Sequence, residues 1–74
     1  MNEENEIKRK KAMFFRDNNI SVHIKKNNNW FCNGFILEIK EDFLILDDEK
    51  EGKMPIFFGE IFEIEKREEK WKEQ

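Results

Sequence analysis

The strongest constraint on the fold is a change of hydrophobic period at Ile20. Before this residue the apolar side chains are spaced as in a helix, whereas after it they follow the pattern of half-buried strands. Five short segments beyond this point carry the strand signal, and connections of two to seven residues separate them. We expect strands at residues 20–25, 30–40, 43–46, 54–58 and 61–65.

Five short strands joined in sequence cannot bury both faces of a flat sheet. We therefore expect the sheet to close into a barrel. Asn33-Gly34 interrupts the longest segment, and a glycine inside a strand marks a bend or a close backbone approach. A long strand bent at this glycine lets a small barrel wrap round itself. Pro55 cannot donate to a strand ladder, which predicts a sheet edge at the start of the fourth strand.

Residues 3–16 are expected to form a helix, because acids lead and bases follow, the order that the helix dipole favours. Ile7 and Phe14 are expected on its apolar side. Asp17-Asn18-Asn19 then ends the helix, since aspartate and asparagine accept turn conformations. We expect a single domain in three parts, namely a basic helix and turn at 1–19, the barrel at 20–66, and a charged tail at 67–74 anchored by Trp71.

The chain has 74 residues with one cysteine, Cys32, and one histidine, His23. These exclude an intramolecular disulfide and a zinc or iron cluster, and no cofactor is expected. Because so short a chain has only a small core, oligomerisation is the remaining way to add stability. A free thiol, a charged N-terminus without an export signal, and no apolar run long enough for a bilayer predict a cytoplasmic protein without membrane contact.

The net charge of −3 conceals an asymmetry along the chain. Residues 1–37 carry seven basic and four acidic side chains (+3), and residues 38–74 carry seven basic and thirteen acidic ones (−6). A nucleic-acid surface is therefore expected toward the N-terminus. The alternative is a solvated helix face, with the basic charges offset by neighbouring glutamates. The candidate phosphate-binding residues are Lys8, Arg9, Lys10, Lys11 and Arg16.

Several segments between Arg16 and Lys66 follow the order found in one family of small barrels. They are Val22-His23-Ile24, Asn33-Gly34-Phe35-Ile36-Leu37, Asp42-Phe43-Leu44-Ile45-Leu46-Asp47 and Ile56-Phe57-Phe58-Gly59-Glu60-Ile61-Phe62-Glu63-Ile64. On these residues the chain resembles the Sm/LSm family, and its Hfq branch in particular. The resemblance implies a mainly β fold, with an N-terminal helix and a strongly bent, five-stranded SH3-like or Sm-like barrel. It also implies a homo-oligomeric ring, a hexamer or heptamer, that binds single-stranded RNA.

The resemblance assigns roles to individual residues. Phe43 matches the Hfq aromatic that stacks on bases, with Phe58 as a second platform and Lys40 beside them at the pore. Lys40 stands where the family has an aspartate, and Phe58-Gly59 lacks the cation of the second family loop. In Sm rings the fourth strand pairs with the fifth strand of the neighbouring subunit, which implies a subunit interface at Pro55, Ile56, Phe57, Ile61 and Phe62.

A second function class stays open beside RNA binding. A small protein-interaction module, monomeric or dimeric, would use Trp30, Phe58 and the acidic hairpin at residues 47–53. Enzymatic activity is not expected, since the sequence contains no recognisable pattern of a paired-carboxylate cleft, catalytic triad, phosphate loop or metal cluster. Cys32 is expected to be a small buried hydrophobe, and His23 to face the polar side of its strand.

Overall fold

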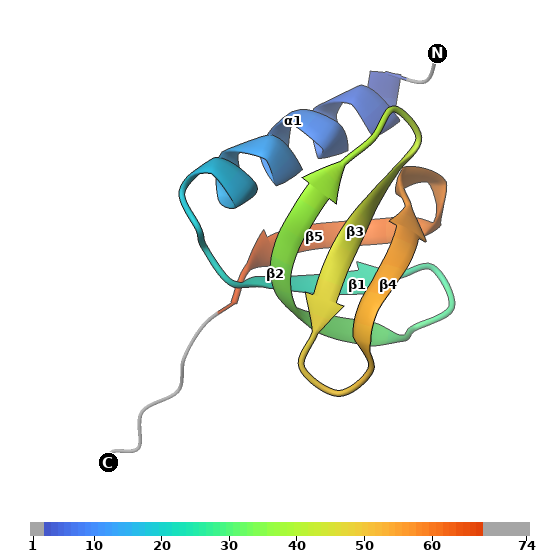
Figure 1. The fold of residues 1–74 in the computed structure, drawn as a ribbon. Helices are drawn as coiled ribbons and strands as arrows, with labels where there is room; N and C mark the ends of the chain where they lie inside the picture. Colours follow the sequence, from blue (N-terminus) through green and yellow to red (C-terminus); the bar gives the residue numbers. More distant parts are fainter. Residues whose placement is uncertain (1–2, 68–74) are drawn as a thin grey trace.

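The computed structural model describes residues 3–67, so the predicted role of Trp71 lies outside the described residues. In this described part of the chain, one α-helix precedes five strands (Figure 1). Within residues 3–67 no helix is long and apolar enough to cross a membrane. The elements are α1 (Glu3–Asp17), β1 (Val22–Lys26), β2 (Phe31–Ile39), β3 (Phe43–Asp48), β4 (Gly52–Phe57), the 3-10 turn η1 (Phe58–Glu60) and β5 (Ile61–Lys66).

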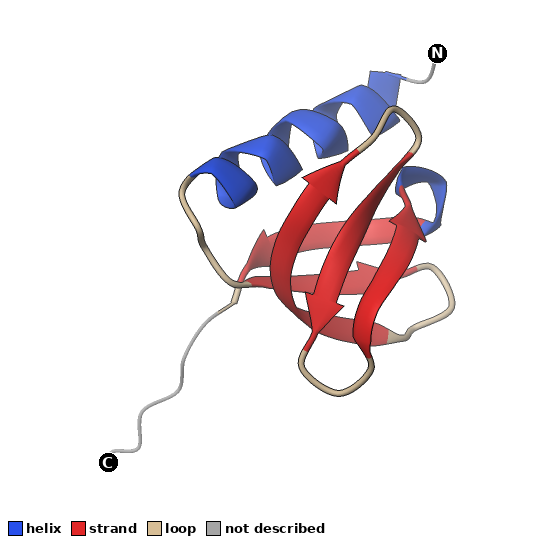
Figure 2. Ribbon diagram, viewed as in Figure 1, coloured by secondary structure: helices blue, strands red, loops and turns tan. Residues whose placement is uncertain are grey.

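The strands form one antiparallel sheet in the order β4-β3-β2-β1-β5. β2 belongs to both halves of this sheet, since residues 31–34 pair with β1 and residues 34–39 pair with β3. Figure 2 shows β1 and β5 lying behind β3 and β4 and running across them, with the bent β2 passing from one layer to the other. The arrangement is an orthogonal packing, in which one strand turns the corner between two layers.

The prediction of a mainly β fold with an N-terminal helix and five strands is confirmed. The predicted closure into a complete barrel is wrong, because β4 and β5 lie at opposite ends of the hydrogen-bonded order and do not pair. The chemistry of the β4 edge accounts for this. The hydrogen bond from the Phe58 N–H to the Asp42 carbonyl sets which residues of β4 bond to β3. Because bonded and unbonded positions alternate along an antiparallel pair, the backbone polar groups of Lys53, Pro55 and Phe57 point away from β3.

Side chains occupy the open edges in place of a partner strand. Pro55 has no N–H to donate, and the Phe57 N–H donates to the Glu60 carboxylate at 3.2 Å. On the other side of the gap, the Lys8 ammonium donates to the carbonyls of Phe58 and Ile61. These contacts occupy the Phe57 N–H and the carbonyls of Phe58 and Ile61, which leaves fewer open backbone groups at the ends of β4 and β5 for another strand.

The helix packs against β2, β5 and η1. Its buried face holds Ala12 and Phe15, and Lys8 lies on the same side one turn earlier. The predicted apolar side was wrong, since Ile7 and Phe14 are 62% and 58% exposed. The reason is that the helix reaches the core only through its last turns, and there the small Ala12 allows the helix to approach the sheet closely.

Gly34 lies where β2 crosses β3 most closely. A Cβ at this position would be 2.0 Å from the Asp47 carbonyl oxygen and 2.8 Å from its carbon, so no side chain fits. The close backbone approach predicted at this glycine is therefore confirmed. The register of the strand pair shifts just beyond it, between Ile36 and Glu38, which leaves Leu37 as an extra residue.

We expect Gly34→Ala to lower the free energy of unfolding by about 3 kcal/mol or more, because the obstacle is backbone and no flexible side chain can yield. The matched control is Gly59→Ala, whose Cβ would meet nothing within 4 Å, and whose effect should stay within about 0.5 kcal/mol. Urea unfolding followed by circular dichroism measures both. Equal midpoints for the two variants would contradict this account of the crossing.

Candidate functional site

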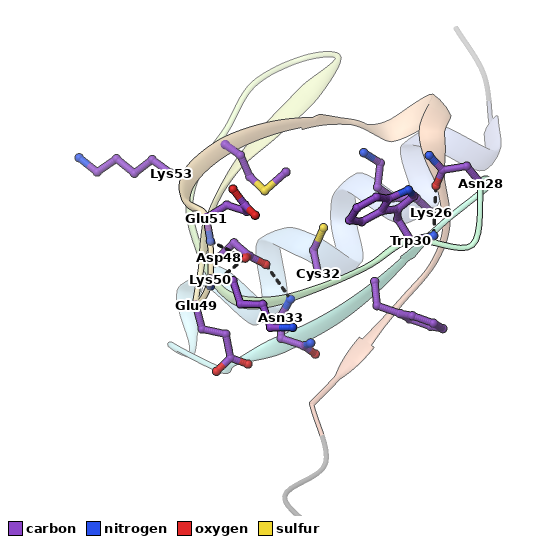
Figure 3. Close-up of a pocket in the computed structure, with 12 residues that line it drawn as sticks. Lys26, Asn28, Trp30, Cys32, Asn33, Asp48, Glu49, Lys50, Glu51 and Lys53 are labelled. Atoms are coloured by element: carbon purple, nitrogen blue, oxygen red, sulfur yellow. Dashed lines mark hydrogen bonds between the residues drawn. The ribbon is translucent and has the colours of Figure 1, made fainter.

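A groove of about 600 Å³ lies between the β1–β2 turn and the β3–β4 hairpin. Before Gly34, β2 pairs with β1 and not with β3. The β1–β2 hairpin and the β3–β4 hairpin therefore separate from each other, and the groove lies between them. Figure 3 shows Trp30 and Asn28 on one side, the hairpin residues on the other, and Cys32 between them. The groove is lined by Lys26, Asn28, Trp30, Phe31, Cys32, Asn33, Asp48, Glu49, Lys50, Glu51, Lys53 and Met54.

The groove combines an apolar floor with an exposed aromatic wall. Cys32 is 5% exposed, which confirms its expected burial, and Met54 packs against the core beside it. Burial raises the pKa of the Cys32 thiol, and the nearby Asp48 carboxylate adds to the rise, so the thiol stays protonated as part of the floor. Trp30 is 66% exposed, the largest exposed fraction among the described large apolar side chains. A large exposed ring thus stands beside an apolar floor.

Asp48 holds the hairpin side of the groove in shape. Its buried carboxylate accepts hydrogen bonds from the backbone N–H groups of Lys50 and Glu51 at 2.9 Å and of Asn33 at 3.1 Å. Burial by itself raises the pKa of this carboxyl, but the three N–H donors outweigh it and hold the pKa below its ordinary value. One ionised side chain therefore shapes the hairpin and ties it to β2.

The charges at the rim are partly neutralised within the chain. Lys26 pairs with Glu60 at 3.1 Å, and Glu49 pairs with Arg67 at 2.6 Å. Burial raises the pKa of Glu60, but the Lys26 ammonium and the Phe57 N–H together lower it below its ordinary value. Within residues 3–67, three rim side chains are left without an ion pair. They are Lys50, Glu51 and Lys53.

The backbone also presents hydrogen-bonding groups to the groove. The Lys26 N–H donates to the Trp30 carbonyl, which makes this a hydrogen-bonded pair of β1 and β2. Since bonded and unbonded positions alternate along the strands, the backbone N–H and C=O groups of Phe31 and Asn33 point away from β1. The N–H of Asn33 is taken by Asp48, and its carbonyl by the Glu49 N–H. Among the described residues, none forms a hydrogen bond with the backbone N–H or C=O of Phe31 on the side that faces away from β1. Its N–H and C=O form a short open edge along the groove.

The predicted basic cluster is dispersed by its contacts. Lys8 is turned toward the fold, Lys11 pairs with Glu65 at 3.0 Å, and Arg16 pairs with Asp17 at 3.0 Å. Lys10 is exposed on the helix. Because three of these cations already have partners, the helix does not present the continuous basic stripe that a phosphate backbone favours.

Some of the predicted RNA-binding residues do lie together at the far end of the molecule. Arg9 donates through Nε to the Lys40 carbonyl at 3.1 Å, and Phe43 packs against Phe57 with ring centroids 5.2 Å apart. Phe58 does not join them as a base-stacking platform. It is 1% exposed, because the 3-10 turn that it opens directs its ring into the core.

Some side chains predicted for a subunit interface are buried in the chain's own core, and others are exposed. Ile56 and Ile61 are 0% exposed, because both side chains fill the chain's own core, and the pairing of strand edges between subunits stays a prediction. Phe57 and Phe62 remain 48% and 61% exposed, and Pro55 is exposed on the edge strand. Three of the five side chains are thus accessible to a partner.

The groove as a whole was missed from the sequence. Trp30 and the acidic hairpin were each named there as interaction features, but nothing local indicates that they face one another. The glycine at position 34 was the available signal, because it indicates a bend in the strand. A strand that changes partner at a bend leaves an open space beside the half that has lost its neighbour.

The sequence matches no known protein-family model and no curated protein. The resemblance to the Sm/LSm family therefore remains a prediction from the residues quoted above.

We expect Asp48→Asn to lower the free energy of unfolding at pH 7 by about 1–3 kcal/mol, because a neutral amide satisfies fewer of the three N–H donors. In the folded state the pKa of Asp48 lies below its ordinary value of 3.8. Its carboxylate thus stabilises the fold above that pH and loses this effect as the pH falls through the folded-state pKa. The variant should therefore lose less stability on acidification than the native chain.

Urea unfolding at a series of pH values from neutral to acidic measures this difference. The matched control is Asp47→Asn, an exposed neighbour on the same strand, whose effect should stay within about 0.5 kcal/mol. Parallel pH profiles for the native chain and Asp48→Asn would show that the buried carboxylate does not stabilise the hairpin.

Proposed function

We propose that this chain is a protein-interaction module that binds an extended peptide segment in the groove beside Trp30. The observation that carries the proposal is a 66% exposed indole beside a groove of about 600 Å³ that has an apolar floor and a polar rim. Tryptophan is among the residues enriched at the hot spots of protein interfaces, because its side chain buries a large area for little loss of conformational freedom.

The groove has the parts that an extended peptide needs. The open N–H and C=O of Phe31 can pair with the peptide backbone, as in the addition of a strand to a sheet edge. A peptide side chain can enter between Trp30 and Met54 and cover the Cys32 floor. Lys50, Glu51 and Lys53 offer charges of both signs at the rim, which suits a polar peptide flank better than a uniformly charged polymer.

Electrostatics favour a peptide over nucleic acid at this site. Three lysines and three carboxylates line the groove, so the lining has no net formal charge. A phosphate backbone therefore meets no continuous row of cations there, and the counterion release that drives nucleic-acid binding is small.

A second candidate function is the binding of single-stranded RNA, as the family resemblance implies. The specific observation in its favour is the gathering of Arg9, Lys40, Phe43 and Phe57 at the end of the molecule opposite the groove. One half-buried cation and one exposed cation beside a partly exposed aromatic pair can hold a phosphate and stack a base. Against it, Lys40 already pairs with Glu38 at 3.1 Å. This candidate therefore ranks second.

For the peptide site, we expect Trp30→Ala to weaken peptide binding at least about tenfold, since the variant removes the aromatic wall. The probes are dodecapeptides enriched from a random display library on the native chain, and fluorescence polarisation measures their affinity. Trp30 is exposed, so the variant should keep its unfolding midpoint.

The matched control is Phe57→Ala, which removes an exposed ring at the other end of the molecule and should leave peptide affinity unchanged. The proposal is overturned by a library that enriches no peptide, or by enriched peptides that bind native chain and Trp30→Ala equally.

For RNA, we expect any affinity for uridine- or adenine-rich oligonucleotides to fall at least about tenfold in Phe43→Ala, because one stacked base loses its platform. Fluorescence polarisation at fixed low salt measures it, and Trp30→Ala serves as the control that keeps RNA binding. No affinity at micromolar protein, or equal affinity in Phe43→Ala, would remove this candidate.

A further inference from the structure

A second surface lies on the outer face of β1, β2 and β5, away from the core. Phe31 and Phe62 are 52% and 61% exposed there, and the Lys25 ammonium lies 5.9 Å from one ring centroid and 5.2 Å from the other. The face is defined by Phe31, Phe62, Lys25 and Glu63, and is called the Phe31–Phe62 face below.

The rings of this face are held in place before any partner arrives. His23 stacks on Phe31 with centroids 4.9 Å apart, and His23 Nδ1 lies 2.6 Å from the Asn33 side-chain oxygen. The register shift between Lys25 and Lys26 inserts an extra residue in β5, which leaves Phe62 and Glu63 both exposed. The Phe31 ring, which His23 holds in place, can therefore be buried with little loss of conformational entropy.

The charges of the face are balanced. Glu65 is neutralised by Lys11 from the helix at 3.0 Å, which leaves Lys25 on β1 and its cross-strand neighbour Glu63 on β5. Within the described part of the chain neither of these two makes an ion pair. One cation and one anion beside two rings make a surface with no net charge, although the chain as a whole carries −3.

We infer that the Phe31–Phe62 face binds a second copy of this chain about a two-fold axis. In such an interface each residue occurs twice, so Lys25 of one copy can meet Glu63 of the other, and the reverse, while the rings pack between them. A face with one charge of each sign is complementary to itself. To a phosphate polymer the face offers one cation beside one anion, and therefore no net attraction.

Two further observations favour a second copy as the occupant. A chain of 74 residues without a disulfide has a small core, and burying exposed phenylalanines between copies adds the apolar burial that it lacks. Assembly through strand edges is opposed by Pro55, by the Glu60 contact to Phe57 and by the Lys8 contacts. The inference does not rest on the proposed peptide, because the two surfaces share only Phe31, whose ring carries the outer face, whereas Trp30 is the anchor of the groove.

Sedimentation velocity at increasing concentration of the full chain tests the inference. The native chain should approach twice its mass of 9.1 kDa, and Phe62→Glu should weaken the dimer about 100-fold, because a carboxylate replaces a central buried ring. The matched control is Phe57→Glu, which places the same charge on an exposed ring of β4 and should leave the dimer intact. Circular dichroism confirms that each variant is folded.

A charge exchange gives an independent and sharper test. Lys25→Glu and Glu63→Lys should each be monomeric alone, since each creates two like-charge contacts across the axis. Mixed in equal amounts they should form a heterodimer, because both contacts then join opposite charges.

A native chain that stays monomeric at millimolar concentration overturns the inference, as does a dimer that survives Phe62→Glu. A mass of six or seven chains would equally overturn it and would favour the edge-paired ring that the family resemblance implies. A mixture that remains monomeric while the native chain dimerises would show that Lys25 and Glu63 do not meet across the interface.

Discussion

The whole β structure depends on the close crossing of β2 and β3 at Gly34. The Asp47 carbonyl oxygen lies 2.0 Å from where a Cβ would stand, so only glycine permits this contact. Because the strands approach so closely, β2 bends and exchanges β1 for β3 as its partner. The same bend separates the start of β2 from β3 and opens the groove, whose hairpin side Asp48 then fixes through three backbone N–H groups.

Charged side chains replace hydrogen bonds that a closed barrel would make between strands. Glu60 accepts from the Phe57 N–H on one side of the gap, and Lys8 donates to the Phe58 carbonyl on the other. Lys26 pairs with Glu60 and so fixes the capping carboxylate in place. A chain in which 42% of the residues are charged thus uses some of them as structural donors and acceptors, and these are unavailable to a phosphate backbone.

The strands could be predicted from the sequence because a period of two is a local property of the chain. The alternation also required that Phe57 and Phe58 face opposite ways, but it could not decide which one is buried. The 3-10 turn decides this by turning Phe58 inward. The role of Lys8 was beyond local reasoning, because its carbonyl partner on Phe58 lies 50 residues away. The groove was missed for the same reason, since Trp30 and Glu51 belong to different hairpins.

Phe31 connects the two surfaces that we propose. Its backbone N–H and C=O face the groove, whereas its ring stacks on His23 and lies beside Lys25 on the outer face. A dimer through the outer face would consequently carry two grooves, one on each copy, with a fixed spacing set by β2. A partner with two suitable segments would bind such a dimer with a high effective concentration for the second segment. A modest affinity at each groove is then enough for tight binding, which suits a groove that offers one aromatic anchor and one open backbone position.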